Sequence, residues 1–270
     1  MALLEIENIR RSFGGLVALD RVTFQVNRGQ IKGLIGPNGA GKTTLFNIIS
    51  GLLPSDTGRV RFKEWPITGW KPYQIARIGI ARTFQNPSLF LRMTTLENIM
   101  VGRHTRSRAD FFKCSLRLPG QRQEERRIQA DARQHLEHLG LGDLADTPAG
   151  SLAFGQRRRV ELARALAAEP ELLLLDEPAS GLNTREKADL GQVIRGIRDR
   201  GVTILLVEHD MAMVMDLADD ILVLHNGTPL AEGPPTAIQN DPSVISVYLG
   251  GELRQAPAGG ELNVKWTQSP

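Results

Sequence analysis

A glycine-rich octapeptide constrains this chain more than any other feature of its sequence. Residues 36–43 are GPNGAGKT, which matches the phosphate-binding loop pattern G-x-x-x-x-G-K-S/T. An apolar run at 31–35 precedes the loop and predicts a buried strand, and residues 41–50 predict a helix that ends at Gly51. The glycines allow successive backbone N–H groups to converge, and the helix N-terminus adds partial positive charge. The sequence therefore predicts a phosphate site at a strand–helix turn.

Side chains in and beyond this loop predict nucleotide hydrolysis. Lys42 supplies a full positive charge for the β and γ phosphates, and the Thr43 hydroxyl is a ligand for Mg²⁺. A second apolar run, at 172–175, is followed by Asp176 and Glu177. A buried strand would hold Asp176 beside Mg²⁺, usually through water, and Glu177 would polarise the attacking water as a general base. Alone, the run would suggest a strand with a solvated acidic end, but the phosphate loop favours the metal site.

The remaining hydrophobic pattern predicts two kinds of sheet. Alternating segments at 3–9 and 22–26 predict half-buried antiparallel strands, and residues 60–62 predict another strand. A helical pattern at 186–200 separates the first two of three buried strands, which indicates βαβ connections and a parallel sheet covered by helices. These three strands are expected at 172–175, 203–207 and 221–224.

Composition excludes several classes of protein. Cys114 is the only cysteine, so no intramolecular disulfide can form and a reducing compartment fits best. No apolar run approaches the roughly 18 residues of a membrane span, and residues 1–10 lack a signal-peptide core. The net charge of +3 is too small to argue for a nucleic-acid partner. Residues 251–270 are rich in Gly, Pro and Gln and predict a flexible tail.

Further motifs, in order along residues 4–249, resemble those of ABC transporter ATPases. SLAFGQ at 151–156 is similar to the family's LSGGQ signature, and SGLN at 180–183 to its D-loop. Gln85 stands where the family has its Q-loop glutamine, His209 where it has its switch histidine, and Phe13, with Val17 beside it, where it has its adenine-stacking aromatic. Within the family, these segments and VYLG at 247–250 resemble the LivG type of branched-chain amino acid importers.

The resemblance implies an α/β fold with a P-loop, RecA-like core, an antiparallel β subdomain and an inserted helical subdomain. We expect one ABC ATPase domain over residues 1–250, with the helical subdomain at about 86–156. A helix is expected at 157–168, directly after the signature.

The family's functional residues carry over position by position, with ATP and Mg²⁺ as cofactors. The catalytic set is Glu177, His209 and Gln85, and the Mg²⁺ ligands are Thr43, Gln85 and Asp176. The nucleotide would contact Phe13, Val17, Asn38, Gly39, Ala40, Gly41, Lys42, Thr43 and Thr44. The signature, which faces the nucleotide of a second subunit, is Leu152, Ala153, Phe154, Gly155 and Gln156.

Two positions depart from the family's usual motifs. Ala153 replaces the signature serine and removes its hydroxyl, and Asn183 replaces the D-loop aspartate and removes one charge. Both changes fit the LivG type. They also suggest that the composite site using this signature is the weaker of two.

The resemblance further implies an ATPase that powers an importer of branched-chain or related amino acids. Its partners would be a second ABC ATPase, for which we favour a heterodimer, two transmembrane permeases and, indirectly, a solute-binding protein. The chain would lie peripherally on the cytoplasmic face of the inner membrane. One alternative is the ATPase of a lipid or lipopolysaccharide exporter, whose type more often has an LSGG signature and a shorter helical insert. A soluble ABC protein of DNA repair or translation is the other, but such proteins usually carry two cassettes or long coiled coils.

Overall fold

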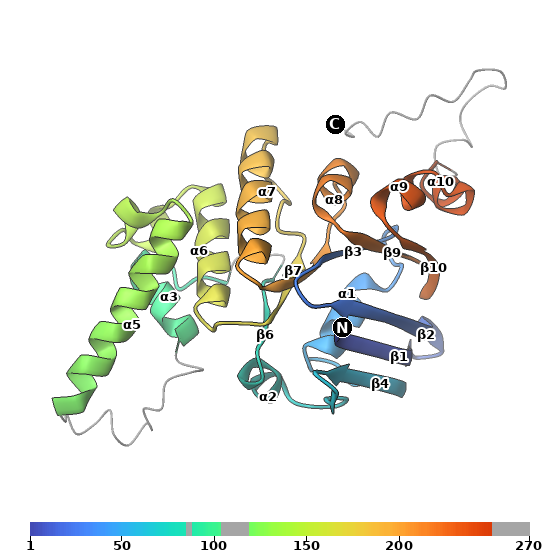
Figure 1. Cartoon of the computed structure of the whole chain (residues 1–270), viewed down its shortest axis with the longest axis horizontal. Coiled ribbons are helices and arrows are strands. Elements are labelled where there is room, and N and C mark those ends of the chain that lie inside the picture. The colour runs from blue at the N-terminus through green and yellow to red at the C-terminus, as the bar shows by residue number, and fades with distance from the viewer. Residues whose placement is uncertain (85–87, 104–118, 250–270) are drawn as a thin grey trace.

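The smaller of two β-sheets is antiparallel, as the alternating segments predict (Figure 1). The computed structural model describes residues 1–84, 88–103 and 119–249. Its first two strands run longer than expected because their pairing continues to a hairpin turn at Gly14 and Gly15, which both have positive φ. This sheet has the order β2-β1-β4-β5, formed by β1 (Ala2–Phe13), β2 (Leu16–Asn27), β4 (Thr57–Phe62) and β5 (Trp65–Pro66).

The larger sheet contains the predicted parallel core. Its order is β10-β9-β3-β8-β7-β6, and only β10 runs antiparallel to its neighbour. Every residue of β3, β7 and β8 is buried, as expected for parallel strands covered on both faces. The strands are β3 (Ile31–Ile35), β6 (Ile80–Arg82), β7 (Leu172–Asp176), β8 (Thr203–Val207), β9 (Asp220–His225) and β10 (Thr228–Gly233).

Strand direction places the predicted chemistry at one edge of this sheet. Because β3, β7 and β8 are parallel, their carboxyl ends meet at the same edge. The phosphate loop follows β3, Glu177 follows β7, and His209 lies just beyond β8. The predicted buried strands are therefore confirmed, and so is their parallel arrangement.

Helices cover the parallel sheet and extend the molecule to one side of it. Figure 1 shows α3 and α5 beyond α6, on the side away from the antiparallel sheet. Helix α6 begins at Phe154, three residues earlier than predicted, so the signature itself forms its first turn. The principal helices are α1 (Lys42–Ile49), α2 (Pro72–Arg77), α3 (Thr95–Arg103), α5 (Pro119–His138), α6 (Phe154–Leu166), α7 (Thr184–Asp199), α8 (Met211–Leu217), α9 (Pro235–Gln239) and α10 (Pro242–Leu249). Short 3₁₀ turns lie at Gly142–Leu144 and Ala149–Ser151.

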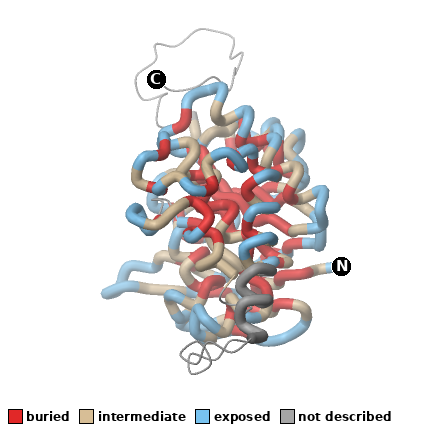
Figure 2. Tube along the Cα trace, turned by 90° about the vertical axis from the view of Figure 1, so that its left-hand side faces the viewer, coloured by how far each residue is buried: buried red, intermediate tan, exposed pale blue. Residues whose placement is uncertain are grey.

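The core follows these layers. One apolar cluster joins the antiparallel sheet and α1 to the parallel sheet, and a second lies between the parallel sheet and helices α3, α5, α6 and α7. A third packs α8, α9 and α10 against the end of β3. Figure 2 shows the buried segments running through the middle of the molecule, with exposed segments at its periphery. Among helices of the described ranges, none has the length and apolar character needed to cross a membrane. The expected tail, 251–270, lies outside the described residues.

Candidate active site

The phosphate loop joins β3 to α1, as its sequence predicts. Asn38, Gly39 and Thr43 are exposed, whereas Ala40 and Lys42 are buried. The Lys42 ammonium folds back onto its own loop and donates hydrogen bonds to the carbonyls of Gly36 (2.6 Å) and Pro37 (3.0 Å). Burial lowers the pKa of Lys42, and the carboxylates of Glu177 and Asp176 act in the opposite direction. Thr44 lies in the first turn of α1, next to Thr43.

Two glycines of this loop are required by close backbone contacts. A Cβ at Gly36 would lie 2.1 Å from the Leu224 carbonyl oxygen, and one at Gly41 would lie 2.6 Å from that of Ala18. Both glycines also have positive φ, at 151° and 100°. Strands β9 and β2 therefore hold the loop from two sides.

The contact between Gly41 and Ala18 of β2 brings the predicted base-stacking residues near the loop. Phe13 and Val17 flank the β1–β2 hairpin turn, are partly exposed, and lie next to the segment that touches Gly41. The Arg11 guanidinium carbon lies 4.9 Å from the centre of the Phe13 ring, and Arg11 also pairs with Asp56 at 2.9 Å. An exposed, supported aromatic ring beside a phosphate loop can stack on a purine.

The predicted general base and switch histidine meet at the ends of β7 and β8. The Glu177 Oε1 and His209 Nε2 atoms are 2.6 Å apart. Glu177 has φ 47°, a left-handed conformation that is unusual for glutamate, and its side chain is 16% exposed. Strain of this kind at a strand end is common where a side chain must be aimed at a ligand. The carboxylate therefore remains accessible while the imidazole fixes its direction.

The expected magnesium ligands have suitable chemistry. Asp176, the last residue of β7, is buried, and Thr43 is exposed at the start of α1. Mg²⁺ prefers hard oxygen donors and keeps several waters or phosphate oxygens, so one carboxylate and one hydroxyl fit it. Gln85, predicted for both catalysis and metal binding, lies outside the described residues.

The signature does not join the phosphate loop within this chain. Figure 1 places α6 across β7 and α7 from α1. Ala153 occupies the N-cap of α6 and has no side-chain acceptor for the first N–H groups of the helix, while its own N–H donates to the Gln156 side chain at 3.0 Å. Phe154 is 45% exposed, and a Cβ at Gly155 would lie 2.8 Å from a Glu186 carboxylate oxygen. Leu152 is buried just before the helix.

Three positions gain roles that the sequence patterns do not predict. Asn183, expected in the D-loop, caps α7 in a capping box. The Glu186 N–H donates to the Asn183 side chain, and the Asn183 N–H donates to the Glu186 side chain, both at 3.0 Å. Arg82 bonds Asp176 at 2.9 Å. Glu208 is buried and accepts from the N–H groups of Ala179 (2.6 Å) and His209 (3.1 Å).

Burial raises the pKa of Glu208, and hydrogen bonds from the backbone act in the opposite direction. Its place at the end of an apolar strand, next to His209, was the one sequence signal that could have indicated a role. Through its two backbone contacts, Glu208 fixes the loop after β7 to the loop after β8. It therefore holds the segments that carry Glu177 and His209 in register.

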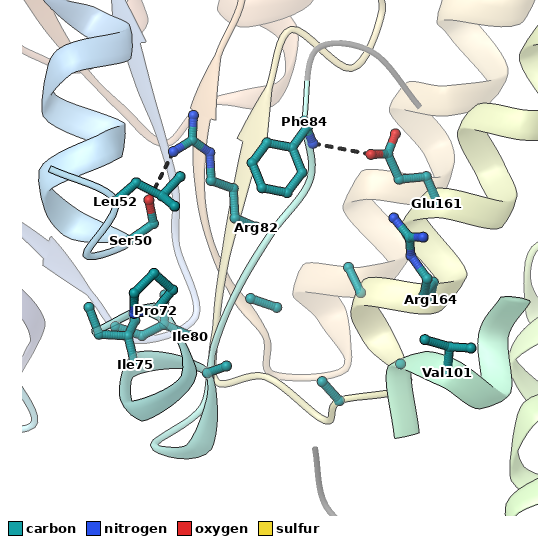
Figure 3. A pocket seen from close by; sticks show the side chains of 15 residues that line it. Ser50, Leu52, Pro72, Ile75, Ile80, Arg82, Phe84, Val101, Glu161 and Arg164 are labelled. Carbon is teal, nitrogen blue, oxygen red and sulfur yellow. Dashed lines mark hydrogen bonds between the residues drawn. The ribbon is translucent and has the colours of Figure 1, made fainter. Parts of the chain in front are cut away.

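A cavity of about 310 Å³ opens between the parallel core and the outer helices (Figure 3). Its walls come from α2, β6, α3 and α6 together with the end of α1. Phe84, 41% exposed, lines it, and its N–H donates to Glu161 on α6 at 3.2 Å. Burial raises the pKa of Glu161, and the neighbouring guanidinium of Arg158 acts in the opposite direction. The segment leading to residue 85 is thus attached to the helix that begins with the signature.

Fold and site together define a P-loop nucleotide-binding protein of the RecA-like class. The loop, the strand-end carboxylates and the histidine lie at one edge of its parallel sheet, and α6, whose N-cap residue makes no side-chain cap bond, lies across β7 and α7 from α1.

Comparison with known proteins places the chain within this class. A family model described as ABC transporter matches residues 19–180, and one described as branched-chain amino acid ATP-binding cassette transporter matches residues 228–253. The chain is 43% identical over 249 residues to BraF of Pseudomonas aeruginosa, a high-affinity branched-chain amino acid transport ATP-binding protein, covering 92% of this chain and 98% of that one. It is 42% identical over 249 residues to LivG of Escherichia coli K12, a protein of the same description, with the same coverage.

A solved structure of an ABC transporter cassette has the same fold. An ATP-binding cassette of an ABC transporter in its ADP conformation is 36% identical, with a TM-score of 0.82, and the match covers 93% of this chain and 99% of that one. The chain belongs to the ABC transporter family of ATP-binding subunits and resembles its LivG and BraF members over most of its length. The resemblance inferred from the motifs and the expected ABC ATPase fold are both confirmed.

Proposed function

We propose that this chain hydrolyses ATP to power an ABC importer of branched-chain or related amino acids. The observation that carries the hydrolysis is the 2.6 Å contact between Glu177 and His209 at the sheet edge that also carries Lys42. If Glu177 acts as the base, its carboxylate would accept this hydrogen bond from His209 Nε2–H. That bond orients Glu177 to take a proton from water attacking the γ-phosphate.

The other residues bind and neutralise the phosphates. Lys42 would exchange its bonds to the loop carbonyls for phosphate oxygens, and Phe13 with Val17 would support the adenine. Thr43, Asp176 and Gln85 would hold Mg²⁺, which when bound neutralises charge that develops on the phosphates.

A second ATPase would complete the site. The first N–H groups of α6 have no side-chain cap, so a γ-phosphate held by another subunit would bind them well. Ala153 offers no hydroxyl to that phosphate, so in a heterodimer the composite site that uses this signature would be the weaker of the two. Loss of the γ-phosphate would remove this contact and let the pair open.

The cavity beside Phe84 is our candidate site for a permease. Both β6 of the core and α6 form its walls, so an inserted segment would contact β6 and the signature helix together. Two of its lining residues, Leu52 and Phe84, are large apolar side chains that are exposed, which is typical of interaction surfaces. Two permeases, with a solute-binding protein acting through them, would hold the chain peripherally on the cytoplasmic face of the inner membrane.

The choice of cargo rests on the names of the relatives and on the match at residues 228–253. The test is a pull-down of tagged Glu177→Gln protein with ATP from native membranes in mild detergent, with a Lys42→Ala variant as the matched control. We expect Glu177→Gln to recover two permeases and a second ABC ATPase, and Lys42→Ala to recover less of the second ATPase, because the contact between the two ATPases is the one that needs bound ATP. Lipid-export components, or soluble partners only, would refute the importer. Uptake of branched-chain amino acids by the recovered system then tests the cargo.

A further inference from the structure

Arg82, at the end of β6, makes an unusual set of contacts for an edge-strand residue. Its side chain is 8% exposed, and its Nη2 donates to Asp176 Oδ2 at 2.9 Å. Its Nη1 donates to Asn47 Oδ1 and Ser50 Oγ, both at 2.8 Å, at the end of α1. Figure 3 shows the bond between Arg82 and Ser50. One guanidinium thus joins β7 to the helix that follows the phosphate loop.

Aromatic rings and α6 restrict the guanidinium further. Its central carbon lies 5.6 Å from the ring centre of Phe46 and 5.2 Å from that of Phe84. Phe84 is in turn held by α6, since its N–H donates to Glu161 and its carbonyl accepts from Arg158 at 3.0 Å. Arg82 therefore has little freedom to choose another position.

This geometry leaves one oxygen of Asp176 for a ligand. Arg82 donates to Oδ2, whereas Oδ1 accepts no hydrogen bond from a residue in the described ranges. The arrangement adds little stability, because desolvation offsets the attraction within a buried ion pair, and the buried Nε of Arg82 has no partner among the described residues. Orientation of the carboxylate is the role that these contacts support.

We propose that Arg82 is a positioning residue that orients Asp176 for the divalent cation of the bound nucleotide. This proposal rests on the proposed role of Asp176 as the metal carboxylate. Residues that orient a metal ligand typically change cation affinity by about 10- to 100-fold when they are replaced. Lysine cannot donate to Asp176, Asn47 and Ser50 in the same fork geometry, so the guanidinium itself is required.

The test measures Mg²⁺ binding without turnover. The full chain is saturated with a fluorescent, non-hydrolysable ATP analogue and titrated with Mg²⁺. For Arg82→Met we expect the half-saturating Mg²⁺ concentration to rise about tenfold. Affinity for the analogue in EDTA should stay within about twofold. Arg82→Lys should behave like Arg82→Met. Arg77→Met is the matched control, since Arg77 is exposed on α2 and contacts Tyr73 rather than Asp176.

Contrary outcomes are distinct. If the role of Arg82 is purely structural, Arg82→Met will lower the melting temperature and leave the Mg²⁺ midpoint unchanged. If the Arg82 charge instead competes with Mg²⁺ for Asp176, Arg82→Met will shift the midpoint to lower Mg²⁺. Either result overturns the proposal. If Arg82→Met does not fold, Asn47→Ala decides, because it removes one anchor of Arg82 and keeps its charge; a rise of about twofold or more is expected. Asp176→Asn tests the underlying assignment: an unchanged midpoint there would refute the metal role, and with it the ground for Arg82.

Discussion

Replacing Glu208 with alanine would remove the link between the loops that carry Glu177 and His209. The buried N–H of Ala179 would lose its acceptor, at a cost of about 1–3 kcal/mol. The part-buried N–H of His209 would lose its own acceptor, at a cost of about 1 kcal/mol. We therefore expect Glu208→Ala to lower the free energy of unfolding by about 2–4 kcal/mol.

Urea unfolding followed by tryptophan fluorescence measures this loss. Glu137→Ala is the matched control, because Glu137 is exposed on α5, and its free energy of unfolding should change by less than about 0.5 kcal/mol. Under conditions where both variants are folded, ATP turnover should fall for Glu208→Ala while nucleotide affinity is retained, since Lys42 and its loop are untouched. A loss of stability no larger than that of the control would refute the structural role assigned to Glu208.

Three further predictions concern the loop, the caps and pH. Lys42→Ala should weaken nucleotide binding by about 100-fold in equilibrium titration, because a charge-assisted contact is worth up to about 3 kcal/mol; unchanged affinity would contradict its phosphate role. Asn183→Ala removes one half of the capping box of α7 and should cost about 1 kcal/mol in urea unfolding, whereas no loss would show that Glu186 caps alone. Burial raises the pKa of Glu208 in the folded chain above its ordinary value of 4.5, which applies to the unfolded chain. Protonation of Glu208 therefore contributes its full stabilisation below pH 4.5, and this contribution is lost as the pH rises through the folded-state pKa. The free energy of unfolding of the wild type should therefore fall relative to Glu208→Gln between pH 4 and 7, and equal slopes would contradict the shift.

Local patterns predicted most of the strands and helices and the position of the phosphate loop. The glycine spacing of the loop and the apolar runs around it encode backbone geometry over a few residues, so the position of Lys42 and the strands β3, β7 and β8 followed directly. Short elements were not predicted, because a few residues do not show a hydrophobic period. Strand β6 has three residues, too few for a period, and forms because β7 offers it a free edge.

Contacts between distant residues depended on the tertiary structure. Glu177 and His209 are 32 positions apart, Arg82 and Asp176 are 94, and the order of strands in the sheet brings both pairs together. The resemblance named Glu177 and His209, which the structure brings together. It gave no role to Arg82, whose partner is a carboxylate on the neighbouring strand, or to Glu208, whose partners are backbone N–H groups in the loops after β7 and β8.

By itself, then, the sequence determined the phosphate loop, the parallel core and the family, because each depends on residues that are neighbours along the chain. Only the tertiary structure decided how the strand-end carboxylates are oriented, that α6 begins within the signature, and where a cavity opens beside Phe84. Those features depend on which strand packs next to which, and a periodic pattern specifies burial without specifying the neighbour.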